Sequence, residues 1–390
     1  MPRAGKQRAA GFDFRAWDSR APSASVRAVR WNHRLKPAPA RGRRLPAACV
    51  GLGPIGLEVA QLVARRSDLF RIVGAVDRAP ALIGTLLRSA LGVPTLRGRV
   101  LSDVRALPAS GGIAFHTTSS RLRDVVESIE MLLDRGWHVV SSTEELAYPT
   151  LRSAALAARI DRAARKAGCV VVGTGINPGF AMDVWPLVLS SNMQTLESVQ
   201  VHRVVDASRR RGPLQRKVGS GLRAREFEAL AREGRIGHVG LVESIAHLGG
   251  MLGWPLDRVD EVLEPRLAQK RVRTQFFDVP AGRVCGIHHR AVARAGRKTR
   301  IVLDLVMALD ARDPHDTIEL EGEPSLRCVV PGGFHGDRTT ASQLVAAAAR
   351  LDGVPPGLHL ASELPAPRWA AFPRALRLLP SRPSRGSAAH

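Results

Sequence analysis

The sequence predicts an α/β fold: a doubly wound parallel sheet followed by a second, α+β domain. Near residue 50, a glycine-rich segment separates a short buried strand from a helix. Strand-like and helix-like stretches then alternate up to about residue 173, which is typical of a parallel sheet covered by helices. Beyond about residue 270, four strand-like runs follow one another, which predicts antiparallel strands in series.

Length and composition support a folded protein of two or three domains. The chain has 390 residues, and 45% of them are apolar. It has no run of about 18 apolar residues, so we expect no membrane-spanning helix and no membrane partner. Its four cysteines lie far apart and form no CxxC pair, which argues against a disulfide framework and a zinc site and predicts a cytoplasmic location.

The net charge of +23 is concentrated at the two ends of the chain. Residues 1–44 carry 12 basic and 2 acidic side chains, and residues 366–390 carry 5 basic and no acidic ones. We expect both ends to be disordered basic extensions, although a transit peptide stays open as an alternative for the first. Proteins that bind single-stranded nucleic acid interleave aromatic residues with basic ones, and only 17 aromatic residues occur here. We therefore predict no nucleic-acid partner.

The glycine-rich segment GLGPIG, residues 51–56, indicates a dinucleotide site. It lies between a strand (45–50) and a helix, and an acidic residue follows 21 positions after its last glycine. Such an acid accepts hydrogen bonds from the adenosine ribose, which favours NAD, whereas an adjacent arginine suits the 2′-phosphate of NADP. Both cofactors stay open. The residues predicted to bind the dinucleotide are Gly51, Gly53, Pro54, Ile55, Gly56, Asp77 and Arg78.

Polar residues follow the next strands of the predicted sheet, near residues 116, 142 and 173. Ligands of doubly wound sheets bind at the carboxyl ends of the strands, so we expect these residues to line one cleft. Thr117 and Ser119 are predicted to contact the cofactor, and Thr143 the substrate. We expect a dinucleotide-binding domain at 45–175 and an α+β substrate and oligomerisation domain at 176–338. A helix within 339–365 is expected to return to the first domain.

Four separate segments carry a family resemblance. They are SSTEELAYP (141–149), GTGINPGFAMD (173–183), DASRRR (206–211) and GGFHGDRTT (332–340), the last followed by PPGL at 355–358. Together they resemble the 2,4-diaminopentanoate dehydrogenase family. That family includes native amine dehydrogenases and is built like dihydrodipicolinate reductase. The resemblance covers about residues 45–365.

The resemblance implies an enzyme that uses NAD or NADP to deaminate a diamino acid or another primary amine oxidatively. It also implies a homo-oligomer, a dimer or tetramer, that associates through the sheet of the second domain. Asn177 is expected to line the cleft beside the cofactor. Phe180 and Trp185 are expected either to shape the substrate pocket or to pack in the core. A substrate carboxylate would be bound by arginine, for which Arg203, Arg209 and Arg210 are the candidates.

This reaction needs a carboxylate near the amine, because the reacting carbon passes through a cationic iminium and water must then be activated. Glu144 and Glu145 follow a predicted strand end and are the catalytic candidates. Their alternative role is to supply negative charge at the start of the next helix. No metal site is predicted.

Two other functions fit the same scaffold. The first is an imine or ketone reductase of the dihydrodipicolinate reductase type. Residues 201–217 contain one histidine and no Pro-Ser-Gly-Thr turn, which argues against the lysine-pathway reaction itself. The second is a nonenzymatic NAD-binding sensor. Turnover of amines with reduction of the cofactor would separate these functions from an amine dehydrogenase.

Overall fold

The computed structural model describes residues 44–109, 111–367 and 369. The predicted extensions, residues 1–44 and 366–390, therefore lie almost wholly outside the described residues. All elements described below belong to the compact unit Ala40–His390. Among the described residues, every helix is too short or too polar to cross a lipid bilayer.

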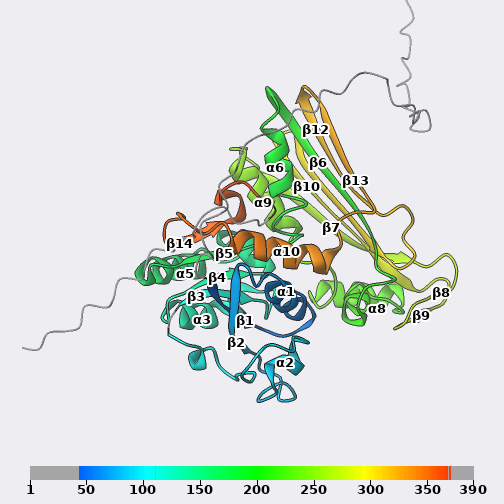
Figure 1. Ribbon diagram of the computed structural model, residues 1–390. Coiled ribbons are helices and arrows are strands. Elements are labelled where there is room, and N and C mark those ends of the chain that lie inside the picture. Colours follow the sequence, from blue (N-terminus) through cyan, green and yellow to red (C-terminus); the bar gives the residue numbers. More distant parts are fainter. Residues whose placement is uncertain (1–43, 110, 368, 370–390) are drawn as a thin grey trace, which may run out of the picture. The chain divides into compact units, whose positions relative to one another are not determined.

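Six parallel strands form the first sheet in the order β14-β5-β4-β3-β1-β2 (Figure 1). Strand β1 pairs with both β2 and β3, so the direction of winding reverses at β1. This is a doubly wound sheet, and it confirms the predicted Rossmann-type architecture. In chain order the strands are β1 (Leu45–Val50), β2 (Phe70–Val76), β3 (Gly112–His116), β4 (Trp137–Ser141), β5 (Val170–Gly173) and β14 (Gly357–Leu360).

Helices cover both faces of this sheet. On one face, α1 (Pro54–Arg65) packs beside α10 (Gly336–Ala348), which comes from near the end of the chain (Figure 1). On the other face, α3 (Leu122–Leu133) and α5 (Ala154–Ala167) share a core with the strands. Both faces are therefore dry, which explains why β3 and β5 are wholly buried. The short elements here are α2 (Leu87–Ala90), η2 (Val104–Ala106), η3 (Glu144–Ala147) and α4 (Pro149–Arg152).

The second sheet has six strands in the order β13-β12-β6-β11-β10-β7. It is mixed, because β6 and β11 pair in parallel while the other neighbours are antiparallel. The prediction of antiparallel strands in series is confirmed for β10 and β11, whereas the parallel pair involves β6, for which no strand was predicted. Its strands are β6 (Thr195–Asp206), β7 (Arg258–Leu267), β10 (Val284–Ala295), β11 (Lys298–Ala308), β12 (His315–Glu323) and β13 (Leu326–Pro331).

The first of the four strand-like runs, at about 272–279, is not one continuous strand in the structure. It consists of two short strands, β8 (Val272–Arg273) and β9 (Asp278–Val279), which pair with each other in a separate small sheet. The intervening loop turns back on itself because the Thr274 hydroxyl accepts hydrogen bonds from the backbone N–H groups of Phe276 and Phe277.

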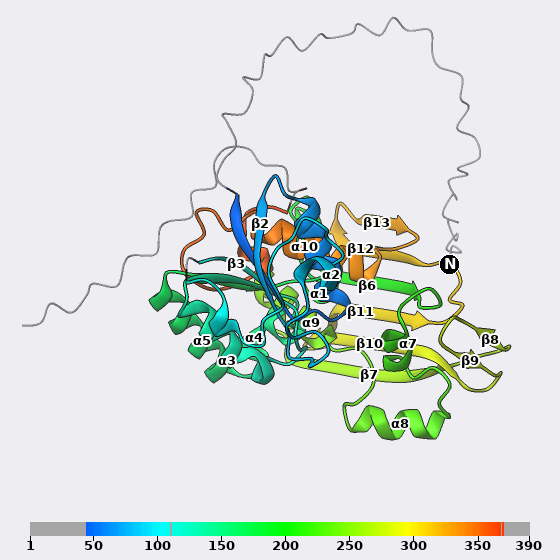
Figure 2. The same ribbon diagram turned by 60° about the horizontal axis from the view of Figure 1, so that its bottom comes forward.

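One face of the second sheet packs against α9 (Leu241–Met251) and α6 (Val184–Ser190), as Figure 2 shows for α9. Leu241, Ile245 and Leu248 lie on one side of α9 at helical spacing and contact the apolar residues of the strands. This packing fixes the sheet relative to the residues just before α9, at about 236–240. The remaining helices are α7 (Gly212–Lys217), α8 (Ala224–Arg232) and η4 (Ala361–Glu363).

Candidate active site

The glycine turn between β1 and α1 has the geometry that a dinucleotide requires. Gly51 has a φ of +86°, a conformation that favours glycine. A Cβ on Gly56 would lie 1.9 Å from the Gly51 carbonyl oxygen, so only glycine lets α1 approach the strand this closely. A Cβ on Gly53, by contrast, would meet no protein atom within 4 Å. The backbone at Gly53 is therefore open to a ligand, and the first turn of α1 offers its N–H groups to a phosphate there.

Asp77 follows β2 and braces this turn. Its Oδ2 accepts a hydrogen bond from the Leu52 N–H at 2.6 Å, and its Oδ1 accepts one from the Ala79 N–H at 2.7 Å. Each carboxylate oxygen keeps a second lone pair, so the side chain can still accept bonds from a ribose. Arg78 is exposed beside it. The glycine turn and the acid together fit a dinucleotide, with Asp77 favouring the unphosphorylated ribose of NAD.

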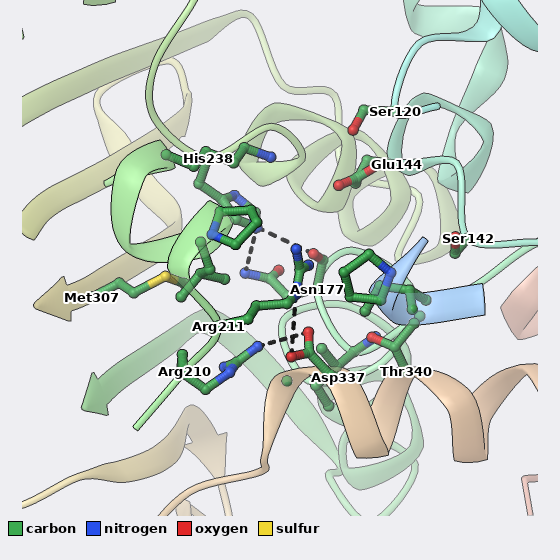
Figure 3. Close-up of a pocket in the computed structure, with 18 of the residues that line it drawn as sticks. Ser120, Ser142, Glu144, Asn177, Arg210, Arg211, His238, Met307, Asp337 and Thr340 are labelled. Carbon is green, nitrogen blue, oxygen red and sulfur yellow. Dashed lines mark hydrogen bonds and ion pairs between the residues drawn. The ribbon is translucent and has the colours of Figure 1, made fainter. Parts of the chain in front are cut away.

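A cavity of about 420 Å³ lies at the carboxyl ends of β1, β3, β4 and β5, against the second sheet. Figure 3 shows side chains from both sheets converging on it, with Asn177 near the centre of the view. Several predicted residues line this cavity, namely Gly53, Pro54, Ile55, Thr117, Ser119, Glu144, Asn177 and Arg203. Those that do not line it are Gly51, Gly56, Asp77, Arg78, Thr143, Glu145, Phe180 and Trp185.

The two candidate acids differ sharply in their surroundings. Glu144 lines the cavity, and none of the described residues forms a hydrogen bond or ion pair with its carboxylate. Glu145 is turned away from the cavity, and its Oε2 accepts a hydrogen bond from the N–H of Leu122, the first residue of α3. Glu145 thus places its negative charge at the N-terminus of α3 and accepts a backbone N–H there. The sequence left such a role at a helix N-terminus open for both acids.

Three predicted substrate contacts do not line this cavity, namely Thr143, Phe180 and Trp185. Thr143 is buried, and its hydroxyl donates to the Ser119 carbonyl at 2.8 Å, which holds two lining loops together. Phe180 stacks on Trp185, with ring centroids 6.4 Å apart, and both rings meet Phe334 edge-on. These aromatic residues pack around α6, and Phe180 and Trp185 also line a second cavity beside α1 and α10.

The loop that follows β3 is hydrogen-bonded to the glycine turn on the buried side of that turn. The Thr117 hydroxyl donates to the Gly51 carbonyl at 2.9 Å. Behind it, His116 is wholly buried, and its ring nitrogens lie 2.9 Å from the Ser128 hydroxyl and 3.3 Å from that of Ser141. Burial lowers the pKa of His116 to about 4, so this ring is neutral at physiological pH and serves to hold the loop.

Arginine and lysine side chains from β6 and from the segment that follows it, up to the end of α7, line the opposite side of the cavity. Arg203 is buried and lies 2.8 Å from Asp316, which also accepts the Phe334 N–H at 2.7 Å. Burial raises the pKa of Asp316, and the neighbouring guanidinium of Arg203 opposes that rise. The sequence predicted Arg203 as a candidate for binding a substrate carboxylate, and Arg203 lines this side of the cavity.

Three further cationic residues line the cavity, namely Arg210, Arg211 and Lys217. We call these three residues the basic wall. Asp337, at the start of α10, forms ion pairs with two of them. Its Oδ1 lies 2.8 Å from Nη2 of Arg210, and its Oδ2 lies 3.4 Å from Nε of Arg211. Of the candidates for binding a substrate carboxylate, Arg209 is exposed and does not line the cavity. Sequence reasoning missed Arg211, Lys217 and Asp337 as lining residues, although the segments that carry the family resemblance contain Arg211 and Asp337.

His238 is a lining residue for which the sequence gave no signal. Its Nε2 lies 3.1 Å from the carbonyl oxygen of Asn177, and its ring meets that of His289 edge-on. Burial lowers the pKa of His238 well below its usual value, and the charge of Lys217 lowers it further. This neutral ring holds Asn177 at the centre of the site (Figure 3). No three His, Cys, Asp or Glu side chains of the described residues are grouped so as to hold a metal ion.

Comparison with known proteins agrees with this architecture. The family model described as the 2,4-diaminopentanoate dehydrogenase C-terminal domain matches residues 180–375. The chain belongs to the 2,4-diaminopentanoate dehydrogenase family. A relative in this family, the 2,4-diaminopentanoate dehydrogenase of Acetoanaerobium sticklandii, is 28% identical over 336 residues, which is 82% of this chain and 93% of the relative. The resemblance seen in the sequence is thereby confirmed.

Solved structures share the fold of this family member. The amine dehydrogenase from Mycobacterium smegmatis superposes with a TM-score of 0.73 at 22% identity, covering 83% of this chain and 97% of that one. An oxidoreductase from Agrobacterium radiobacter, in complex with NAD+, L-tartaric acid and magnesium, reaches a TM-score of 0.51 at 12% identity, over 80% and 90% of the two chains. At these identities the likeness concerns the arrangement of the two sheets.

Substitution of Gly53 tests the dinucleotide site. Gly53→Val should leave the protein folded, because no protein atom lies within 4 Å of the added Cβ, yet abolish cofactor binding, because the side chain would occupy the place of the phosphates. Fluorescence titration with NADH and NADPH, with circular dichroism as the folding check, measures both effects. Gly56→Val is the contrasting variant and should fail to fold. Undiminished affinity in folded Gly53→Val would remove the site from this turn.

Proposed function

We propose that this protein is an NAD(P)-dependent amine dehydrogenase, which oxidises a CH–NH₂ group to a ketone and releases ammonia, and which runs in reverse as a reductive aminase. Membership of the 2,4-diaminopentanoate dehydrogenase family supports the reaction class. The observation that carries the proposal is the carboxylate of Glu144, which has no hydrogen-bond or ion-pair partner among the described residues and lies in the same cavity as the open backbone of Gly53.

The chain provides a place for each part of the cofactor. Gly53, Pro54 and Ile55 would hold the pyrophosphate, and Asp77 the adenosine ribose. The nicotinamide end would then reach the cavity, where Thr117 and Asn177 line the wall. When bound, the nicotinamide accepts hydride from the carbon that carries the amine. The contribution of the protein is to align that carbon, manage the protons and limit the access of water.

Glu144 is suited to the charge changes of the reaction. Its carboxylate would pair with the substrate ammonium, take a proton from it and pass that proton to solvent, because the amine must be neutral before its carbon loses hydride. The carboxylate, ionised again, would then stabilise the positive charge of the substrate iminium. Water adds to the iminium carbon to form the carbinolamine, and Glu144 would accept a proton of that water. It would return this proton to the nitrogen of the carbinolamine, so that ammonia leaves as the carbonyl forms.

Two structural features hold this acid in position. The η3 turn that carries Glu144 is joined to helix α3, because Glu145 accepts a hydrogen bond from the N–H of Leu122. It continues into α4, where Arg152 donates to Glu243 on α9 at 2.5 Å. Glu243 is wholly buried, so this ion pair connects the Glu144 segment to the helix that packs on the second sheet. We propose that both anchors keep Glu144 directed into the cavity.

The proposal extends to assembly and location. Opposite α9, the second sheet presents Val204 and Val306, both only partly buried, and the family resemblance implies self-association through this sheet. We expect multi-angle light scattering to give the mass of a dimer or tetramer; a monomer at micromolar concentration would contradict this.

All four cysteines are free thiols, which suits the reducing cytoplasm.

Replacing Glu144 tests the mechanism. Glu144→Gln should lower kcat for amine oxidation by about 10²–10⁴-fold, because the amide can neither accept a proton nor balance the iminium charge. The affinity for NAD or NADP should stay close to that of the wild type, since the dinucleotide is bound elsewhere. Steady-state absorbance of the reduced cofactor, with a panel of primary amines, provides the measurement.

Glu145→Gln is the matched control. Its amide oxygen can still accept the Leu122 N–H, so we expect near-normal turnover and a small loss of thermal stability. Loss of turnover in Glu145→Gln with normal turnover in Glu144→Gln would assign the role to the neighbour. Tight binding of NAD(H) with no turnover of any amine or ketone by the wild type would favour the sensor function instead.

A further inference from the structure

A second cavity, of about 450 Å³, lies between helices α1, α6 and α10. Its lining is mainly apolar, and Val188 is 46% exposed there. We call this cavity the α6 groove, and its apolar lining residues include Leu62, Phe180, Trp185, Val188 and Val345. Apolar side chains that gather in one open hollow indicate a surface that another group covers. The α6 groove therefore predicts an occupant with an apolar face.

The last described residues of the chain lie at this groove. Pro367 and Trp369 line it, and the guanidinium carbon of Arg66 lies 5.2 Å from the centre of the Trp369 ring. This cation–π contact holds one face of the indole, yet Trp369 is still 80% exposed. A large apolar surface is thus left for further residues to cover. The chain continues from this point, so the residues after Trp369 begin at the α6 groove.

The ten residues that come next differ in composition from the end of the chain. Seven of the ten residues 370–379 are apolar, whereas two of the ten residues 381–390 are. The match to the family model also runs to residue 375, so it includes the first half of the apolar segment. Both observations separate residues 370–379 from the polar, basic sequence that follows them.

The order of the residues in this segment fits an amphipathic helix. At 3.6 residues per turn, Phe372, Leu376 and Leu379 would share one face, and Arg374 and Arg377 would lie on the other. A proline stands next to each end of this stretch, as is common where a short helix begins and ends. None of the described residues that line the α6 groove is acidic. The apolar face therefore suits the groove, and the arginine face suits solvent.

We infer that residues 370–379 dock in the α6 groove as a short amphipathic helix, with Phe372, Leu376 and Leu379 against its apolar lining. The docked segment connects α1 and α10, which cover the first sheet, to α6, which packs on the second. Because the segment begins at the groove, its effective concentration there is high and modest contacts suffice. This inference goes beyond the proposed amine dehydrogenase function and does not depend on it. It shortens the basic extension that the sequence predicts from residue 366.

Photochemical cross-linking tests the contact directly in the full-length chain. The variant Phe372→p-benzoyl-phenylalanine is irradiated and digested, and mass spectrometry identifies the joined peptides. We expect the segment around position 372 to be joined to peptides of α6 or α10. Mixing unlabelled chains with isotopically labelled ones shows whether each link lies within one chain, which is the expected result. The matched control, Ser384→p-benzoyl-phenylalanine, places the same group in the polar end of the chain and should give far fewer links to the α6 groove.

Thermal unfolding followed by circular dichroism measures what the docking contributes. Leu376→Ser should lower the Tm by about 3 °C or more, because a polar group replaces an apolar side chain in the α6 groove. Leu378→Ser is the matched control, since it makes the same change on the opposite face of the helix and should leave the Tm unchanged. Truncation after Trp369 should lower the Tm further and raise the fluorescence of an apolar dye that binds the open groove. Truncation after Pro380 should change neither.

Four results would overturn the inference. Links between labelled and unlabelled chains would assign the α6 groove to a second copy of the chain. Links from position 372 to other surfaces, or none, would show that the segment does not dock there. An unchanged Tm after truncation at Trp369 would leave the groove to a small apolar ligand. Equal losses of Tm in Leu376→Ser and Leu378→Ser would contradict docking through one helix face. The cross-link is measured on the full-length chain, so it decides the matter even if the truncated chain fails to fold.

Discussion

Helix α1 can lie against the end of β1 only because Gly56 has no side chain, since a Cβ there would come within 1.9 Å of the Gly51 carbonyl oxygen. Much of the site depends on this close approach. Helix α10 packs beside α1 and begins at Gly336, where a Cβ would lie 2.6 Å from the guanidinium of Arg210. The next residue, Asp337, binds Arg210 and Arg211. The position of α1 therefore determines both the dinucleotide turn and, through α10, the basic wall on the far side of the cavity.

The first sheet could be predicted from the sequence because its signals are local. The GLGPIG turn, the acid after β2 and the alternation of strands and helices each occupy a short stretch of chain. Strand β6 gave no such signal, because its twelve residues mix polar and apolar side chains and it lies at the centre of a mixed sheet. Its parallel pairing with β11 joins residues about a hundred positions apart. No local pattern contains that information.

The site could be predicted in part. Glu144 and Glu145 are indistinguishable in sequence, since both follow the same strand, and a hydrogen bond to Leu122, 23 residues away, separates their roles. The basic wall was obscured for a compositional reason: 58 Lys and Arg residues give many equivalent candidates. Arg209 and Arg210 are adjacent, yet one is exposed and the other is buried against α10. Tertiary packing, and not residue type, selects the residues that face a ligand.

We propose that hydride passes in this cavity from an amine-bearing carbon to a nicotinamide. The most direct measurement uses an amine labelled with deuterium at that carbon, with mass spectrometry of the reduced cofactor after turnover. The reduced cofactor should gain one deuterium, and the ketone product should form in equal amount. Reduced cofactor without deuterium, or ketone formed without cofactor reduction, would contradict it.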